Sequence, residues 1–453
     1  MADAQTQSDG PAGRSYSHRI PLAKLLCLRQ IIERLAPRSP LELCLLPPVF
    51  LDDYVNDSGG DDVPRLAYCC YPCGQEGWEA EPSSPKESRV PAQLLPDDAD
   101  LEVAEAQPGD AEGWDRFVDQ HSEGRFCHLW GFRRALQEGY AYRCVYVNIL
   151  ARGHRVGIFP SIVLHRGLGK LVSQPFNEYG GPLTENFSPP LYSKLAALLL
   201  RVAHQERCRS VEIRGGIGLE AATRAGWSRT PVHSYATLPL AGPDHLWRHA
   251  LTGEARKGVN RALHAGLRAE IRRGAAAVAD EFYPLYLLSM KRLGVPPHRR
   301  EFFLQLAAGL GNRLVAAWVQ QSQKVAAILL AGIAGKRIHI FVTASETGTW
   351  SLRPNDLAHW ELIRWAHSAA LETLDFGSAR YAGQIQFKKK WGAAFQEYCI
   401  YRIGPPDNSA PLHMGITASS SRLMRLMSNA WRHTVPLSWT EILGPPIRKY
   451  LTR

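Results

Sequence analysis

The sequence predicts a mixed α/β fold in two consecutive halves that follow a poorly ordered leader. Three observations support this prediction. After about Trp114, helix-like stretches with apolar residues three and four apart alternate with short strand-like runs. The order of helices, paired strands, helix and strand occurs twice, in residues 106–240 and 241–404. Residues 1–105 contain mostly turn and linker chemistry instead, which predicts an irregular leader.

Composition places the chain among globular proteins. Its 453 residues suffice for two or three domains, and 45% are hydrophobic and 21% charged. No run of about 18 apolar residues occurs, so we expect no membrane span. The polar N-terminus lacks the pattern of a signal peptide, and the nine cysteines do not form a compact disulfide framework. These features together predict a cytoplasmic protein.

Charge is distributed unevenly along the chain. Residues 1–105 contain 18 acidic and 9 basic side chains, while the whole chain carries +10. Residues 106–453 must therefore carry +19. A basic body of this kind attracts phosphates, anionic glycans, RNA or a lipid surface. Solubility alone explains the same charge equally well, so charge by itself identifies no ligand.

The leader contains one helix-like island and one cysteine knuckle. Residues 23–36 have helical apolar spacing. Cys70 and Cys73 form a C-x-x-C pair next to Cys69, but no second C-x-x-C pair follows. A structural zinc site needs four ligands, so we expect no metal site here.

Residues 106–240 predict the first set of elements. Two stretches with helical spacing come first, and two strands joined by a tight turn follow them. A turn-rich loop then leads to a long helix that starts at Pro189, a strand and a short helix. The expected helices are 113–121, 128–139, 189–207 and 219–227, and the expected strands are 143–150, 155–165 and 210–215.

Residues 241–404 predict a similar order. Four helical stretches precede three strands in series, and a long helix and two further strands follow. The expected helices are 244–251, 254–266, 280–294, 300–311 and 354–372, and the expected strands are 312–320, 324–334, 337–345, 373–377 and 396–403. Residues 405–453 are expected to form a C-terminal helical extension.

Several common catalytic templates are missing. The sequence has no G-x-G-x-x-G after a strand, no G-x-x-x-x-G-K-[ST], no G-x-S-x-G and no H-E-x-x-H. A D-F-G triplet occurs at residues 375–377, but the other kinase motifs do not accompany it. Rossmann-type, P-loop, serine-hydrolase, zinc-protease and kinase chemistry are therefore not supported.

Two stretches of the second half could bind anions. Residues 254–273, taken as a helix, bring Arg256, Lys257 and Arg261 close together, with further arginines beyond. This pattern fits either a site for an anionic substrate or a solvated basic face. A second candidate is the helix expected at residue 354, whose free N–H groups could bind an anion beside Arg353. An ordinary turn between a strand and a helix is the simpler interpretation there.

The stretch LDFGSARYAGQIQFKKKWGAA, residues 374–394, combines a buried strand, a glycine-containing loop and three lysines between two aromatics. Phe387 and Trp391 share one face in an extended segment and stack at i and i+4 in a helical one. In either conformation they anchor the backbone, so at least one lysine is held in place. A held ammonium can stabilise the oxyanion of an acyl-transfer reaction. A solvated lysine run would not need this aromatic bracket.

This stretch resembles the signature of the FemAB-like acyltransferases, which runs roughly F-G-R-S, a spacer with glycine, then F-K-K-x-W-G. Other landmarks occur in the same order, among them FCHLWGFRRAL, QPFNEYGGPL, ARKGVNRALHAGL and LRPNDLAHWELIRWAH. The C-terminal stretch resembles a subgroup found beside exosortase and exopolysaccharide systems. The resemblance covers residues 114–451 and leaves the leader uncovered.

The resemblance implies two tandem GNAT-like domains and transfer of an acyl or aminoacyl group to an amine or hydroxyl of an envelope or polysaccharide precursor. It implies that Lys388, beside Phe387, stabilises the charge of the transition state. It also implies a substrate cleft between the two GNAT-like halves, which Tyr179 would line. The arginine of the family's F-G-R-S motif corresponds to Ala379 in this sequence, or is displaced by one position to Arg380. The remaining residues assigned to substrate binding are Arg256, Lys257, Arg261, Arg353 and Trp391.

The resemblance leaves the donor open between acyl-CoA and aminoacyl-tRNA, because the loop before the 354 helix lacks a glycine-rich pyrophosphate pattern. Glu178 and Asp375 are the carboxylates nearest the motifs, and neither is a strong candidate for a general base. Expected partners are an anionic precursor and, if the donor is aminoacyl-tRNA, tRNA, but no DNA. Two other hypotheses stay open: a non-catalytic polysaccharide-binding module, and an RNA-binding protein whose affinity falls steeply with salt.

The C-terminal stretch SRLMRLMSNAWRHT, residues 421–434, predicts a basic amphipathic helix. Such a helix can lie on a membrane surface, which would put the protein at the inner face of the membrane. More often its apolar face packs on the parent domain, and we favour that interpretation.

Overall fold

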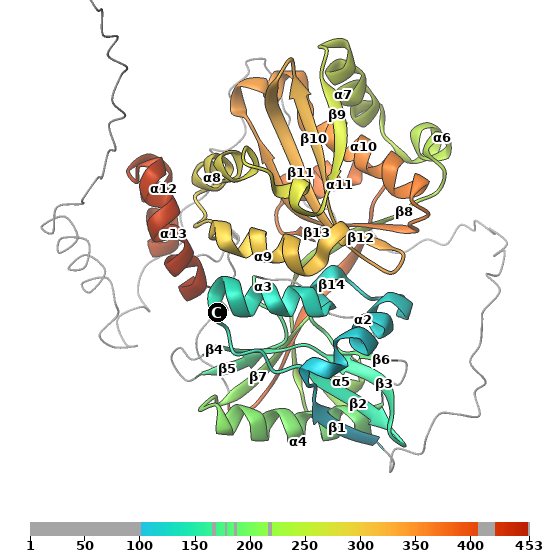
Figure 1. The fold of residues 1–453 in the computed structure, drawn as a ribbon, viewed down its shortest axis with the longest axis vertical. Helices are drawn as coiled ribbons and strands as arrows, with labels where there is room; N and C mark the ends of the chain where they lie inside the picture. The colour runs from blue at the N-terminus through green and yellow to red at the C-terminus, as the bar shows by residue number, and fades with distance from the viewer. Residues whose placement is uncertain are drawn as a thin grey trace, which may run out of the picture. The chain divides into compact units, whose positions relative to one another are not determined.

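The computed structural model describes residues 101–164, 169–176, 179–184, 188–215, 220–405 and 422–451 (Figure 1). It confirms the predicted mixed α/β class, with sheets flanked by helices. The expected helix at 23–36, the cysteine knuckle and Glu178 lie outside the described residues. Strand β1 begins within the last residues of the predicted leader, at Leu101.

The described residues from Leu101 to residue 240, which are the first half and the strand before it, contain eight strands and four α-helices. The strands are β1 (Leu101–Glu105), β2 (Val147–Ala151), β3 (His154–Phe159), β4 (Ile162–Leu164), β5 (Lys170–Val172), β6 (Leu183–Thr184), β7 (Ser210–Arg214) and β8 (Ser228–Pro239). The helices are α2 (Ala111–Gln120), α3 (Trp130–Tyr140), α4 (Pro189–Gln205) and α5 (Glu220–Arg224).

The second half and the extension follow the predicted order closely. Their helices are α6 (Pro243–His245), α7 (Gly253–His264), α8 (Phe282–Leu293), α9 (Arg300–Leu310), α10 (Pro354–Ser368), α11 (Ala382–Lys389), α12 (Arg422–His433) and α13 (Leu437–Leu451). Their strands are β9 (Arg268–Arg273), β10 (Leu314–Gln321), β11 (Lys324–Ala334), β12 (Arg337–Ser345), β13 (Thr373–Ala379) and β14 (Ala394–Ile403).

Three elements differ from the sequence prediction. The strand expected over residues 155–165 is divided into β3 and β4, which belong to different sheets, because Pro160 between them has no N–H to donate to a sheet. The basic helix expected over residues 254–273 ends at His264, and its second part is the edge strand β9. Gly266 has φ +78°, a backbone conformation that ends a helix and that glycine adopts without steric cost. Strand β8 was not predicted at all. It is a long strand in which only Tyr235, Ala236 and Leu238 are buried, so it has no regular apolar pattern and is placed by its pairing with β13 and β14.

The halves exchange their last strands within one ten-stranded sheet, whose order is β4-β5-β7-β14-β8-β13-β12-β11-β10-β9. Strand β14 from the end of the second half lies between β7 and β8 of the first half. Strand β8 in turn pairs with β13, and Leu238 lies opposite Leu374. The boundary at residue 240 stays a prediction, because hydrogen-bonded pairing crosses it. The strands β1-β2-β3-β6 form a second sheet.

Strand β10, which lies between β11 and the edge strand β9, shows why the second half needs helices on both faces of its sheet. Its residues are buried on both sides, and successive side chains point to opposite faces. Leu314, Ala316 and Trp318 belong to one hydrophobic cluster together with residues of α8 and α9. Val315, Ala317 and Val319 belong to a second cluster with residues of α7 and α10.

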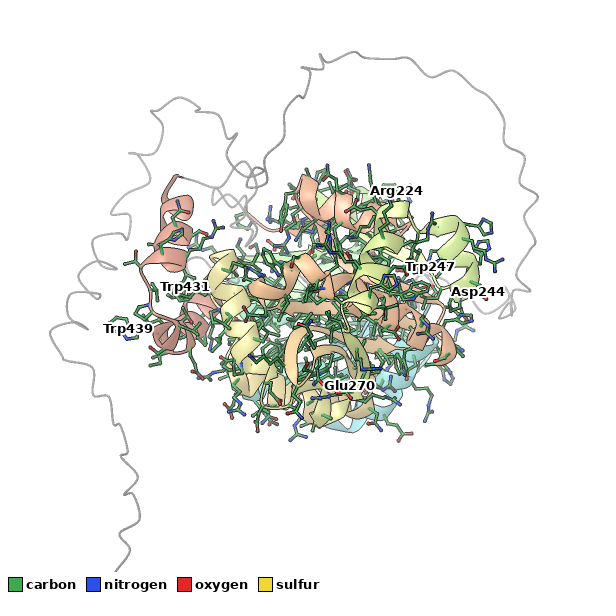
Figure 2. All side chains as sticks on the ribbon, turned by 90° about the horizontal axis from the view of Figure 1, so that it is seen from above. Arg224, Asp244, Trp247, Glu270, Trp431 and Trp439 are labelled. Atoms are coloured by element: carbon green, nitrogen blue, oxygen red, sulfur yellow. The ribbon has the colours of Figure 1, made fainter. Side chains whose placement is uncertain are left out.

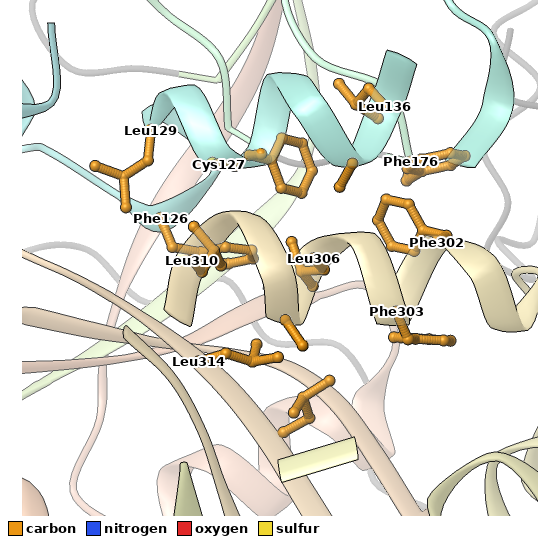
Figure 3. Close-up of a cluster of buried hydrophobic side chains, with 14 of the residues drawn as sticks. Phe126, Cys127, Leu129, Leu136, Phe176, Phe302, Phe303, Leu306, Leu310 and Leu314 are labelled. Atoms are coloured by element: carbon orange, nitrogen blue, oxygen red, sulfur yellow. The ribbon is translucent and has the colours of Figure 1, made fainter. Parts of the chain in front are cut away.

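Helices α3 and α9 pack side by side and connect the two halves (Figure 3). Small residues allow this approach, because a Cβ atom added to Gly131 would lie 2.2 Å from the carbonyl oxygen of Gly309. Around this contact, Phe126, Phe302 and Leu306 contribute to one continuous buried cluster that spans both halves. The core therefore belongs to both halves jointly.

The C-terminal helices use several cationic groups to bind backbone carbonyls. Arg448 Nη1 donates to Pro296 O at 2.8 Å, and Lys449 Nζ donates to Tyr140 O at 2.5 Å. Lys291 Nζ of α8 donates to Arg432 O at 2.6 Å. Trp431 is buried, and Figure 2 labels it beside Trp439 of α13. These contacts support packing on the parent domain, and membrane contact stays a proposal. No helix among the described residues is both long and apolar enough to cross a membrane.

Candidate active site

The three lysines of the F-K-K-K-W-G stretch have three different surroundings. They lie at the C-terminal end of α11, so neighbouring side chains point in different directions around the helix. Lys388 is buried against the end of β13, Lys390 is buried against α10, and Lys389 is exposed. The bracket predicted from the sequence is present as well, since the rings of Phe387 and Trp391 lie 6.3 Å apart.

Lys388 is held by two backbone carbonyls. Its Nζ donates to Gly377 O at 2.7 Å and to Ser378 O at 2.6 Å, and the residue is only 7% exposed. An ammonium has three N–H donors, so one remains after these two bonds. Burial lowers the pKa of Lys388 to about 7, while Asp375 acts to raise it and Arg380 to lower it further.

The carbonyls that bind Lys388 lie where the pairing of β13 with β12 has ended and its pairing with β8 is irregular. Pairing of β12 with β13 ends at His339 and Asp375, although both strands continue beyond these residues. The pairing of β13 with β8 is irregular between Asp375 and Ser378. Gly377 has φ +69°, which favours glycine and turns the backbone toward α11. Lys388 thus binds the two carbonyl groups at the irregular part of β13.

Asp375 anchors this irregular segment and joins it to the first half. Its Oδ1 accepts from Gly377 N at 2.8 Å, and its Oδ2 accepts from Arg125 Nε at 3.0 Å. Burial would raise the pKa of Asp375, but His339, Arg125 and Arg337 outweigh burial, so that the pKa lies below its usual value. Asp375 is therefore an ionised structural anchor, which argues against its use as a general base.

Lys390 forms a buried ion pair with Asp356 of α10. Their closest atoms, Nζ and Oδ1, are 2.6 Å apart, and both residues are at most 6% exposed. The ammonium also lies 4.4 Å from the centre of the Phe387 ring. Asp356 lies in the first turn of α10, where the helix dipole favours a carboxylate. The pair connects the end of α11 to the start of α10.

Gly258 makes room for this pair, because a Cβ atom at this position would lie 2.2 Å from Asp356 Oδ2. We expect Gly258→Ala to lower the free energy of unfolding by about 1–3 kcal/mol. Gly253→Ala, on the same helix with open space around it, should change it by less than about 0.5 kcal/mol. Urea unfolding of both variants measures the difference. Equal stability of the two variants would contradict the close contact.

The predicted aromatic residues surround a histidine instead of facing solvent. Trp391 is fully buried, and its ring lies 5.7 Å from that of His359. Phe387 contacts the same histidine at 4.9 Å, and Phe376 stacks on it at 5.9 Å. Burial lowers the pKa of His359 to about 4, so its ring is neutral near pH 7. These aromatics hold α11 against α10.

The predicted binding residues fall into two groups. Tyr179 and Arg380 lie near the end of β13: the ring of Tyr179 is 4.4 Å from Arg125 Cζ, and Arg380 Nη2 donates to Ser378 Oγ at 3.5 Å. Tyr179 is buried, so it supports Arg125.

The second group lies on α7 and at the start of α10. Arg256 donates to Trp247 O and Leu251 O at 2.9 and 2.6 Å, so its guanidinium holds the turn before α7. Lys257 and Arg261 are exposed on α7, and Arg353 is exposed with φ +64° at the cap of α10. A role of these cations in binding an anion stays a prediction.

Sequence reasoning missed Arg125, Asp356, His339 and His359. Asp356 and His359 could have been found from the sequence, because their i, i+3 spacing places both on the buried side of α10. Arg125 could not have been found in this way, because its partner Asp375 is 250 residues away in the chain. Among the described residues, no group of three or more His, Cys, Asp or Glu side chains could hold a metal ion.

Comparison with known proteins gives three findings. The family described as "Acetyltransferase (GNAT) domain" matches residues 251–389. The fold is similar to the crystal structure of FemX, with a TM-score of 0.52 and 14% identity, covering 66% of this chain and 96% of FemX. A search of curated proteins found no match.

Two further solved structures share parts of the fold. One is the C-terminal domain of a putative lysylphosphatidylglycerol synthetase from Agrobacterium fabrum, with a TM-score of 0.47, 12% identity, and coverage of 65% of this chain and 91% of that one. The other is a tandem GNAT protein from the clavulanic acid biosynthesis pathway, with a TM-score of 0.45, 11% identity, and coverage of 68% and 100%. The chain thus carries a GNAT acetyltransferase domain, and its fold is that of the FemAB-like GNAT proteins.

Proposed function

We propose that this protein is an acyltransferase that moves an acyl or aminoacyl group to an amine or hydroxyl of a cell-envelope or exopolysaccharide precursor. One observation carries the proposal. Within the segment that matches the GNAT domain, Lys388 is buried, is fixed by two carbonyl oxygens and keeps one N–H free of them. The precursor class rests on the resemblance of the sequence landmarks, and it would place the protein at the inner face of the membrane.

The geometry suits stabilisation of a developing negative charge. When an acceptor amine or hydroxyl attacks the acyl carbon, a bond to that carbon forms and the carbonyl π electrons move onto its oxygen. The remaining N–H of the Lys388 ammonium can donate to that oxygen without any rearrangement, because the other two N–H groups already hold the side chain. The intermediate then collapses, the acyl–leaving-group bond breaks with its electrons on the leaving group, and the proton lost by the acceptor passes through solvent to the leaving group.

The same geometry also permits the opposite role. A neutral Lys388 amine donates two N–H groups to Gly377 O and Ser378 O and keeps a lone pair that can accept the acceptor's proton. The two carbonyls favour the charged form, because oxygen lone pairs interact more strongly with an ammonium. We therefore assign Lys388 the ammonium role.

The pH dependence of turnover separates the two roles. Burial lowers the pKa of Lys388 to about 7, so the ammonium is present below that pH and is lost above it. The ammonium role predicts that kcat falls about tenfold per pH unit above the pKa of the complex. A base role predicts instead that kcat rises with pH below that pKa and levels off above it. The profile is measured in steady-state assays, and the Lys388→Arg variant should lack this decline because arginine stays charged.

The start of α10 favours an aminoacyl ester over acyl-CoA as the donor. Pro354 contributes no N–H, and the N–H groups of Asp356 and Leu357 donate to Arg353 O at 3.1 and 3.4 Å. The carboxylate of Asp356 occupies the same turn. A diphosphate would therefore find few free donors at this helix start. A basic body with a charge of +19 fits tRNA as the carrier of the ester, with Lys257 and Arg261 as exposed contacts.

Parallel assays with labelled donors test the proposal. The purified protein is incubated with envelope glycan precursors and either labelled aminoacyl-tRNA or labelled acyl-CoA, and products are identified by mass spectrometry. We expect label from the aminoacyl ester in the glycan product. No transfer from either donor, with glycan binding retained and the host phenotype rescued by Lys388→Met, would favour the non-catalytic binding module.

A further inference from the structure

Arg125 is a buried arginine of the first half whose main partner lies in the second half. It is 3% exposed, and its Nε donates to Asp375 Oδ2 at 3.0 Å, where Asp375 is fully buried. The guanidinium also lies over the rings of Tyr179 and Tyr235, at 4.4 and 5.7 Å from their centres. Asp375 and Glu123 raise the pKa of Arg125 although burial alone would lower it, so the group stays charged.

A short series of hydrogen bonds leads from this arginine to Lys388. Asp375 uses one carboxylate oxygen for Arg125 Nε and the other for Gly377 N, at 2.8 Å. Gly377, held at φ +69°, presents its own carbonyl oxygen to Lys388 Nζ at 2.7 Å. Each bond in the series is buried. A shift of the Asp375 carboxylate would therefore move the carbonyl that holds the ammonium.

We propose that Arg125 of the first half is a positioning residue for Lys388, acting through Asp375 and the backbone of Gly377. The inference deepens the proposed acyltransferase function and rests on it for its catalytic meaning. Its physical content is a coupling between the halves: the place and charge of the ammonium depend on an arginine that is not part of the matched GNAT segment. Residues 251–389 would then lack one determinant of their own site.

Several other charged groups surround this series and enter any test of it. Asp375 and Arg380 act on Lys388 directly, and Lys388 in turn acts on the buried imidazoles of His339 and His359. On the first-half side, the Glu123 carboxylate forms ion pairs with Arg125 and Arg337, at 3.2 and 3.1 Å. The effect of the series through Asp375 on the titration of Lys388 is therefore separated from the effects of these groups by comparing the Lys388 midpoint between variants.

The test follows the titration of Lys388 by NMR of labelled lysine side chains in the full chain, from about pH 5 to about pH 10. Comparison with Lys388→Arg assigns the signal. Asp375→Asn removes the carboxylate that favours the ammonium, so the midpoint should fall by about one unit. Arg125→Met should also shift the midpoint by about one unit, and should add no further shift in the Asp375→Asn background. If Arg125→Met does not fold, Arg125→Lys is used in its place.

The control is Arg313→Met, because Arg313 makes another ion pair between the halves, with Asp119 at 2.5 and 2.7 Å, and has no bond to this series. It should leave the Lys388 midpoint unchanged. An unchanged midpoint in the Arg125 variants, or shifts of Arg125 and Asp375 that simply add, would overturn the inference. Since no substrate is used, a positive result combined with full activity of Lys388→Met would defeat the proposed function and leave the coupling standing.

Discussion

Replacing Lys388 by methionine is expected to lower kcat by roughly 10²–10³, the usual cost of removing one preorganised oxyanion donor. Methionine keeps an unbranched chain of similar length but removes the charge and all three N–H groups. The KM for the donor should change much less, because the N–H acts on charge that develops in the transition state. Steady-state kinetics with the donor that proves active measures both quantities.

The neighbouring Lys389 provides a matched control, because it is exposed on the same helix turn. Lys389→Met should retain full activity. Lys388→Met also leaves Gly377 O and Ser378 O without a donor, which costs about 1–3 kcal/mol of stability, so its unfolding must be measured beside its activity. Wild-type turnover in a folded Lys388→Met variant would reduce Lys388 to a structural clamp on an irregular strand.

Replacing Lys390 by methionine is expected to lower the free energy of unfolding by about 3–5 kcal/mol with little effect on the chemistry itself. The change leaves the buried carboxylate of Asp356 without its ammonium partner, 2.6 Å away in the wild type. An unpaired buried charge is costly because no water replaces the lost interaction. Urea unfolding, followed by tryptophan fluorescence and circular dichroism, measures the loss.

A double variant identifies the cause of that loss. Lys390→Met combined with Asp356→Leu removes both charges and leaves two apolar side chains, so most of the lost stability should return. Lys389→Met should change stability by less than about 0.5 kcal/mol. If the double variant is less stable than Lys390→Met alone, the ion pair is not the source of the effect, and packing around Phe387 is the better explanation.

Much of the fold followed from local pattern. The helices at Trp130, Pro189 and Phe282 and the strands β10, β11 and β12 were predicted because each carries its own apolar periodicity and its own end signals. Strand β8 has no such pattern, because few of its residues are buried and its place is set by pairing with β13 and β14, which are distant in the chain. The basic pattern of residues 254–273 does not reveal where α7 ends and β9 begins, because arginine is compatible with both a helix and an edge strand.

The sequence predicted Lys388 at the centre of the candidate site, but it did not predict the buried residues around it. Lys388 could be singled out because its motif and its aromatic bracket are contiguous in the chain. The separate tasks of Lys388, Lys389 and Lys390 could not, since they depend on the angular positions of three neighbours around a helix end. Arg125 and Asp356 needed the folded chain, because their partners come from other elements.

The sequence alone determined the α/β class, the order of most elements and the lysine stretch beside a buried strand, because all of these are encoded in short windows. Only the tertiary structure decided which lysine is held by carbonyls and which by Asp356, and that an arginine of the first half anchors the strand that carries those carbonyls. The reason is physical: burial and ion pairing depend on which distant segments meet, and the exchange of β8 and β14 between the halves is set by long-range pairing.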